Sequence, residues 1–263
     1  MGKYAVRTVA LGYLTIVLLG PLAMMVWRTF DDLGAAWDAI TQENTIAAFK
    51  LTLLVTAIAV PINTLFGIVC GLVIERKKVR GRGVINAFVD LPLALSPVVV
   101  GLSMVLLYGA NGWFGFFPEH GIDILFATPA IVIATIFISL PFVAREVIPT
   151  LREIGDEQEQ AAATLGSSGW QTFRRITLPS IKWAVIYGVV LTTARCFGEY
   201  GAVLVVSGNI EGRTQTATMR VDEAYQFAYG NYAAAYGISL VLAAMAILVL
   251  LTMLLVQRKG TRA

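Results

Sequence analysis

Charged residues are scarce in this 263-residue sequence, since only 14% are Asp, Glu, Lys or Arg, whereas 57% are hydrophobic. A soluble domain carries roughly a quarter charged residues. With a mean hydropathy of +0.73, the chain has too little polar surface to cover a core of this length in water. The composition therefore excludes an ordinary soluble protein and predicts an integral membrane protein.

The residues that carry most enzyme chemistry are also nearly missing. His120 is the only histidine, and the two cysteines, Cys70 and Cys196, lie inside apolar runs where we expect small buried thiols. Neither a metal site nor a disulfide framework is predicted from so few ligands. The sequence has no G-x-x-x-x-G-K-[ST] phosphate-binding loop. We therefore expect no catalytic residue, no metal and no cofactor in this chain, and any ATP that drives it to be bound by a partner subunit.

Long apolar runs dominate what is present. A helix needs ~20 apolar residues to cross a ~30 Å hydrocarbon layer, and six runs are long enough, the fifth being interrupted only by Arg195 and Glu199. Small residues at the spacing Gly67-x-x-x-Gly71 form a candidate helix-packing face. The expected spans are residues 8–27, 51–74, 91–118, 124–144, 183–206 and 233–256.

Basic residues alternate between the connections. Four lie on one side of the predicted spans (Arg28, Lys50, Arg213 and Arg220), and fifteen lie on the other. Because Lys and Arg accumulate in cytoplasmic loops, both termini are expected in the cytoplasm. The fifteen are Lys3, Arg7, Arg76, Lys77, Lys78, Arg80, Arg82, Arg145, Arg152, Arg174, Arg175, Lys182, Arg258, Lys259 and Arg262.

The longest inner connection, residues 145–183, has its own helical signals. Residues 155–165 (GDEQEQAAATL) begin acidic and continue rich in alanine, and Gly166 is placed to end a helix there. Ser168 and Gln171 have capping-box spacing for a second short helix, which we expect Pro179 to break before the fifth span. Two capped helices joined at a glycine can insert into a groove of a partner. An ordinary amphipathic surface helix remains the alternative.

This connection resembles the EAA motif of binding-protein-dependent ABC importer permeases, E-A-A-x3-G-x9-I-x-L-P. The match runs from residue 160 to residue 179, on the expected cytoplasmic side and before the fifth span. Gln160 stands at the motif's glutamate position, with Glu159 one place earlier. The resemblance implies that the connection docks on a separate ATPase through Glu159, Gln160, Ala161, Ala162, Gly166, Ile176, Leu178 and Pro179.

Further stretches narrow the resemblance. Residues 91–101, 140–147 and 195–203 look like the sulfate/thiosulfate and molybdate permeases, and 207–216 looks closer to the sulfate branch. Within that branch, the chain most resembles the W-type subunit. This implies an all-α fold with about six transmembrane helices, of the type I importer (MetI-like) kind, in the bacterial cytoplasmic membrane. The implied partners are a second, T-type permease subunit, two copies of a cytoplasmic ABC ATPase, and an extracytoplasmic sulfate-binding protein. The net charge of +3 gives no reason to expect nucleic acid.

The expected organisation has three parts. Residues 1–50 hold the first transmembrane helix and an outer loop, and residues 257–263 form a basic cytoplasmic tail. Residues 51–256 form the transport core, including the coupling connection 145–183.

Two pairs of residues inside the membrane are candidates for the translocation path. An arginine at the bilayer centre costs about 2.5–3.5 kcal/mol, so Arg195 is expected to face the bundle interior. Glu199 is four residues further on and shares a helix face with it. The pair either fixes helix packing or helps to line an anion path. Ser96 and Pro97 are expected to bend the third span and are a candidate gate.

An outer segment combines one charge with several hydrogen-bonding side chains. We expect it to be exposed and to contact a docked binding protein, with an ordinary solvated loop as the alternative. The residues are Asn209, Arg213, Thr214, Gln215 and Thr216.

Other functions fit parts of this pattern. A molybdate or tungstate permease and the T-type sulfate subunit share most of the resemblance. A secondary anion transporter or channel explains six spans with an Arg/Glu pair, but it does not explain the EAA-like connection. A membrane enzyme lacks a nucleophile and base at a common depth.

Overall fold

The computed structural model describes residues 2–77 and 81–260, which form helices and connecting segments without a β-strand among them. The all-α prediction is thereby confirmed. Lys78, Arg80 and Arg262 of the predicted inner charges lie outside the described residues, as does the end of the basic tail. Five described helices are long and apolar enough to cross a membrane, and there are six such spans if the bent pair Arg82–Ala94 and Pro97–Tyr108 is counted as one.

The first two spans are long. α1 (Lys3–Leu14), a π-helical turn (Thr15–Leu19) and α2 (Gly20–Asp31) run into one another, and Val6–Asp31 is long enough to cross a membrane. α3 (Leu33–Thr41) follows, capped by the Asp32 carboxylate, which accepts from Ala35 N. α4 (Glu43–Arg76) begins eight residues before the expected start at 51 and continues to Arg76.

The third span is broken at Ser96 and Pro97, which confirms the expected bend, but its helices occupy residues 82–94 and 97–108 rather than the predicted 91–118. α5 (Arg82–Ala94) and α6 (Pro97–Tyr108) meet at 104°. Ser96 has ψ of 136°, because a residue before proline is driven out of the α region. The chain then leaves helical structure at Gly109, and α7 (Phe116–Glu119) is a single turn at the outer end.

The fourth and fifth spans reach further into the inner connection than expected. α8 (Thr128–Ser139) and α9 (Pro141–Ile154) form one crossing, so residues 145–154 are helix rather than loop. After α10 (Glu157–Thr164), a continuous helix runs from Gly169 to Phe197 through α11 (Gly169–Thr172), a π-helical turn (Phe173–Thr177) and α12 (Leu178–Phe197).

Pro179 therefore does not break the second short helix, contrary to the prediction. Proline lacks an N–H and crowds the carbonyl of residue i−4. The π-helical turn directly before it widens the helix, with Leu178 N bonded to Phe173 O. The predicted span 183–206 is also wrong at its end, because α12 stops at Phe197 and α13 (Gly201–Ser207) begins a separate short helix.

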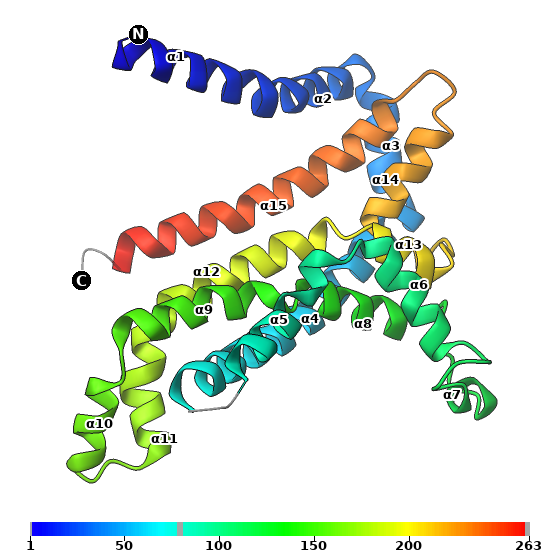
Figure 1. Cartoon of the computed structure of the whole chain (residues 1–263). Coiled ribbons are helices and arrows are strands. Elements are labelled where there is room, and N and C mark those ends of the chain that lie inside the picture. Colours follow the sequence, from blue (N-terminus) through cyan, green and yellow to red (C-terminus); the bar gives the residue numbers. More distant parts are fainter. Residues whose placement is uncertain (1, 78–80, 261–263) are drawn as a thin grey trace.

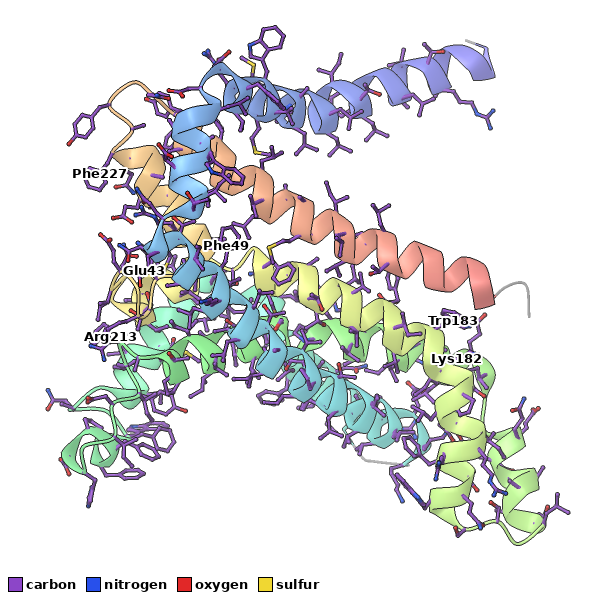
Figure 2. The ribbon with its side chains drawn as sticks, turned by 180° about the vertical axis from the view of Figure 1, so that it is seen from behind. Glu43, Phe49, Lys182, Trp183, Arg213 and Phe227 are labelled. Atoms are coloured by element: carbon purple, nitrogen blue, oxygen red, sulfur yellow. The ribbon has the colours of Figure 1, made fainter. Side chains whose placement is uncertain are left out.

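The remaining elements are α14 (Ala217–Gln226) and α15 (Ala233–Gly260), which agrees with the expected last span. In Figure 1 the start of α1, the end of α15 and the pair α10–α11 lie at one end of the molecule, and α3, α7 and α14 lie at the other. Figure 2 places Lys182 at the first end and Arg213 at the second. This arrangement puts both termini on the side of the predicted inner connection, which the charge bias assigns to the cytoplasm.

Helices α4, α9 and α12 pack against one another along the centre of the molecule. Val143 on α9 lies between two glycines: a Cβ on Gly67 of α4 would be 2.6 Å from Val143 Cβ, and one on Gly188 of α12 would be 2.8 Å from Val143 Cα. A Cβ on Gly71 would likewise be 2.8 Å from Val147 Cγ1. The predicted packing role of the two α4 glycines is confirmed.

Candidate functional site

The inner end carries a helical elbow, which we define as residues 155–172 and which holds α10, the turn at Gly166 and α11. Gly155 and Gly166 have positive φ values of 70° and 84°, which glycine adopts without steric cost. The predicted capping box is confirmed: Ser168 Oγ accepts from Gln171 N at 3.3 Å, and Gln171 Oε1 accepts from Ser168 N at 3.0 Å. The elbow therefore consists of α10 and α11, joined by a defined turn at Gly166.

The EAA-like residues divide between the elbow surface and its attachment. Gln160 and Ala161 are exposed on α10, whereas Ala162 is half-buried. The most exposed apolar side chains of this region are Leu165 at 88% and Trp170 at 68%, on either side of Gly166. Ile176 and Leu178 are half-buried on the helix that leads into the fifth span, and Pro179 is exposed there. The elbow thus presents an uncharged tip with apolar side chains, a surface suited to insertion into a partner.

Glu159 does not belong to that exposed surface. Its carboxylate lies 2.8 Å from Arg76 Nε and accepts a 2.7 Å hydrogen bond from Thr177 Oγ1. Arg76 is the last residue of α4, and the sequence analysis counted it only as one of fifteen basic residues. No pattern in the sequence pairs residue 76 with residue 159.

Two helix breaks meet toward the outer half of the molecule. The bend at Ser96 precedes α6, and residues 198–200 separate α12 from α13. A Cβ on Gly201 would be 3.1 Å from Pro97 Cβ, and one on Gly101 would be 2.9 Å from Ala202 O. Broken helices with adjoining ends are where transporters expose backbone groups to a substrate. The candidate gate residues Ser96 and Pro97 are therefore brought next to the Glu199–Gly201 segment.

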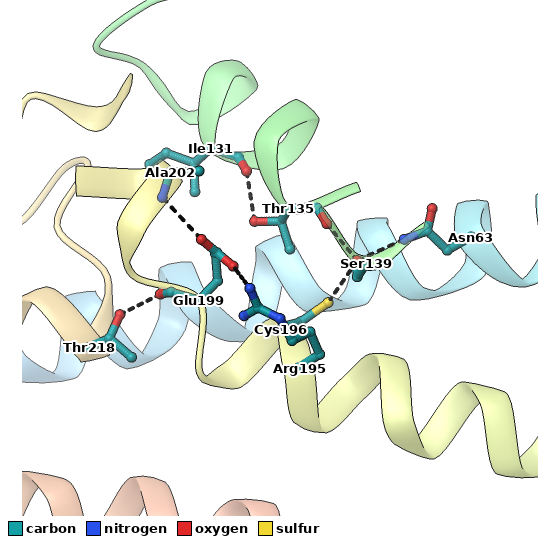
Figure 3. Close-up of polar contacts among 9 residues, drawn as sticks. All are labelled: Asn63, Ile131, Thr135, Ser139, Arg195, Cys196, Glu199, Ala202 and Thr218. Atoms are coloured by element: carbon teal, nitrogen blue, oxygen red, sulfur yellow. Dashed lines mark hydrogen bonds and ion pairs between the residues drawn. The ribbon is translucent and has the colours of Figure 1, made fainter. Parts of the chain in front are cut away.

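The Arg195–Glu199 pair forms as expected, but not on one helix. Arg195 is in the last turn of α12, and Glu199 lies beyond its end. Arg195 Nη2 is 2.7 Å from Glu199 Oε2, an ionic contact without the directionality of a hydrogen bond. Glu199 Oε1 accepts from Ala202 N in the first turn of α13, and its carbonyl accepts from Thr218 Oγ1 (Figure 3). Glu199 thus connects the end of α12 to the start of α13. It also pairs with Arg195, whose side chain is 29% exposed.

A buried polar chain adjoins this pair. Asn63 on α4 donates to Ser139 Oγ at 2.8 Å and to Ile136 O at 3.1 Å. Ser139 Oγ in turn donates to Thr135 O, and Cys196 Sγ donates to Ser139 Oγ at 3.6 Å (Figure 3). Asn63 Oδ1 has no hydrogen-bond partner within the part of the chain that the structure describes, although the residue is fully buried. The sequence analysis missed this hydrogen-bonded network, because single polar residues in apolar runs carry no spacing signal.

The outer segment differs from its expected exposure. Asn209 and Arg213 are exposed, but Thr214, Gln215 and Thr216 are buried at 4%, 1% and 5% exposure. Most of their side-chain hydrogen-bonding groups are used inside the fold, the exception being Gln215 Oε1, which has no partner among the described residues. Thr214 Oγ1 donates to Ser207 O, and Gln215 Nε2 donates to Asn209 Oδ1 and Glu223 Oε2. The expectation of an exposed docking strip is therefore wrong for these three residues.

Glu223, on α14 outside the spanning helices, is the charged centre of this outer network. It lies 2.8 Å from Arg220 Nη1 in addition to its bond from Gln215. Desolvation alone would raise the pKa of Glu223, but the hydrogen bonds from Gln215 and Arg220 outweigh it and leave this pKa below its ordinary value of 4.5. The carboxylate is therefore ionised at neutral pH.

Comparison with known proteins agrees with this geometry. The family model described as "Binding-protein-dependent transport system inner membrane component" matches residues 63–260. The sulfate transport system permease protein CysW of Synechococcus elongatus is 50% identical over 220 residues, which cover 83% of this chain and 77% of that protein. The corresponding CysT protein of Salmonella typhimurium is 35% identical over 252 residues, covering 95% and 90%.

Solved structures share the fold. The bacterial alginate ABC transporter, crystallised with an alginate-bound periplasmic protein, contains a chain that superposes with a TM-score of 0.81 at 19% identity, covering 99% of this chain and 95% of that one. The arrangement of helices is thus that of an importer permease, as expected. Since the family match spans most of the transport core and the helices cross the membrane several times, this chain is a multi-pass membrane protein that belongs to the family of binding-protein-dependent transport system inner membrane components.

Proposed function

We propose that this chain is the W-type permease subunit of an ATP-driven sulfate importer, forming part of the translocation path. Support comes from the higher identity to the CysW relative, 50% against 35% for the CysT relative. The observation that carries the mechanism is the capped elbow at the inner end, which is built as a stiff projection rather than a flexible loop. The chain has no nucleotide-binding loop of its own, so ATP hydrolysis is assigned to a separate subunit.

The proposed assembly contains a T-type permease, two ATPase subunits and an extracytoplasmic binding protein. Within it, the exposed tip formed by Gln160, Leu165 and Trp170 contacts the ATPase. Because Gln160 is neutral, this contact is formed by hydrogen bonds and apolar burial rather than by an ion pair. Asn209 and Arg213 remain candidates for contact with the binding protein, since both are exposed at the outer end.

The test is uptake by the purified assembly in proteoliposomes. We expect radiolabelled sulfate to accumulate only when this chain, its permease partner, the ATPase and the binding protein are all present with ATP. Uptake by this chain alone would identify a secondary transporter or channel and contradict the proposal. Uptake of molybdate in preference to sulfate, measured with the same components, would favour the molybdate branch.

We also propose that Arg195 lies on the anion path. Its guanidinium is at the paired helix breaks, is 29% exposed and is partly neutralised by Glu199, an arrangement that attracts a dianion without trapping it. Arg195→Leu is expected to lower the uptake rate about tenfold, and Arg195→Lys to restore part of it. Equal uptake by the leucine variant in a normally assembled complex would leave Arg195 with only a packing role.

A further inference from the structure

The inner end of α4 reaches the elbow through one side chain. Arg76, the last residue of α4, uses its whole guanidinium: Nη1 donates to Leu151 O at 3.0 Å, Nη2 to Gly155 O at 2.7 Å, and Nε to Glu159 Oε2 at 2.8 Å. Its side chain is 15% exposed. Three donors therefore bind three acceptors from α9, from the α9–α10 turn and from α10.

The chemistry of these acceptors explains why a guanidinium fits there. The last carbonyls of a helix have no intrahelical donor, and Leu151 and Gly155 lie at the end of α9. Gly155, at φ 70°, turns the chain sharply after Ile154. A cation at this end also complements the helix dipole. Arg76 thus caps α9 from a neighbouring helix.

Glu159 completes the junction. It lies in the first turn of α10, where a carboxylate is favoured by the dipole. One of its oxygens contacts Arg76, and the other accepts at 2.7 Å from Oγ1 of the buried Thr177, in the π-helical turn before α12. Both oxygens are occupied within the chain. Glu159 is therefore unavailable as the ionic partner of another subunit, although it lies next to the EAA glutamate position.

We propose that Arg76 and Glu159 are positioning residues for energy coupling. Together with Thr177 they fasten α10 to the inner ends of α4, α9 and α12, so that a displacement of the elbow moves all three helices as one body. This inference rests on the proposed importer function. The inference goes beyond that function, because it assigns the transmission step to an internal junction rather than to the surface that touches the ATPase.

The test compares transport with hydrolysis in the same proteoliposomes containing the complete importer. Glu159→Gln keeps the side-chain size but removes the charge, and Arg76→Gln removes the three-way contact. We expect sulfate imported per ATP hydrolysed to fall about tenfold for Glu159→Gln, which weakens one charge-assisted contact, and further for Arg76→Gln, which removes three. Hydrolysis itself is expected to persist, because the exposed tip of the elbow is unchanged. Arg76→Lys is expected to restore only part of the ratio.

Arg152→Gln is the matched control. Arg152 also joins α9 to α4, with Nη2 2.7 Å from Glu75 Oε1, but its partner is not on α10 and its side chain is 65% exposed. We expect this variant to import sulfate with the wild-type ratio. If Glu159→Gln assembles normally and keeps that ratio too, the junction has no role in coupling and the inference is overturned.

Two further results distinguish a failure of the junction from a failure of the proposed function. Should Arg76→Gln fail to assemble, Glu159→Gln decides, because it leaves the Arg76 contacts to both carbonyls in place. If the unaltered chain imports sulfate without any ATPase, the proposed function itself is wrong, and the junction then has no transmission step to serve. A normal ATP-driven importer with an unaffected Glu159→Gln variant refutes only the junction.

Discussion

The close packing of α4 against α9 gives a quantitative prediction for Gly67→Ala. An added Cβ would lie 2.6 Å from Val143 Cβ and 2.8 Å from Ala144 N, where ordinary contact begins at 3.4 Å. The new methyl must therefore move about 0.8 Å away from α9. Val143 cannot move away from α4, because α12 packs closely against its other side. A Cβ on Gly188 of α12 would be 2.8 Å from Val143 Cα. Overpacking of this kind costs about 1–3 kcal/mol, which corresponds to roughly 2–12 °C in Tm for a chain of this size.

The measurement is the thermal unfolding midpoint of the purified importer in detergent. Gly83→Ala serves as the control, because among the described residues no atom outside its own turn of helix lies within 4 Å of the Cβ that this exposed position would gain. We expect the control to match or slightly exceed the wild-type Tm, since alanine is the better helix former by about 1 kcal/mol. A Tm for Gly67→Ala equal to that of the control would mean that α4 and α9 are not packed at glycine distance. Combining Gly67→Ala with Val143→Ala should recover only a small part of the loss, because it removes Val143 Cγ1, which lies 2.7 Å from the new Cβ, but leaves Val143 Cβ and Ala144 N in place.

Three other predictions follow from single contacts. Asn63→Asp should block assembly, because it places a carboxylate in a fully buried site at a cost of several kcal/mol; Asn63→Leu, assayed alongside by gel filtration, should assemble. Ser168→Ala removes the elbow's capping bond and should cost about 1 kcal/mol, detected as faster limited proteolysis at residues 165–170. Because the pKa of Glu223 is lowered, its stabilising effect is full above 4.5 and is lost as pH falls through the folded-state pKa; the Tm difference from Glu223→Gln should therefore shrink below pH 4.5.

Much of this architecture could be predicted from the sequence because the lipid solvent imposes simple rules. Apolar runs of crossing length became helices, and basic residues in alternating connections gave the sidedness that Figure 1 agrees with. The caps of the elbow were also predictable, since Ser168, Gln171 and Gly166 act within a few residues of their own positions. Helix capping and hydropathy can both be read from the sequence without knowledge of the tertiary contacts.

The errors have a common cause, which is that tertiary contacts decide where helices break. Pro97 and Pro179 both follow helix-like sequence, yet the first ends a helix and the second sits inside one. Before Pro97, Ser96 is extended and α13 packs against the new helix start, whereas the turn before Pro179 relaxes into a π-helix. The junction of Arg76 with Glu159 was equally invisible, because 83 residues separate its members.

Burial of the outer segment shows the same limit for function. Thr214, Gln215 and Thr216 are polar residues in a connection, which favours an exposed binding strip by composition alone. The structure uses them instead to tie the end of α13 to α14, with Ala217 N donating to Thr52 Oγ1 on α4. Their hydrogen-bonding groups are needed there because the segment is buried and water cannot satisfy them.

The two candidate sites lie at opposite ends of the same packed helices, and this constrains how they communicate. The elbow is fastened to α4, α9 and α12 at Arg76 and Glu159, while the helix breaks begin where α12 ends at Phe197. Between them, Gly67, Val143 and Gly188 hold the three helices at backbone contact. Close-packed interiors transmit displacement as rigid bodies rather than absorbing it. We therefore expect a movement of α10 to appear at residues 198–200, the first place after α12 where the chain leaves the helix.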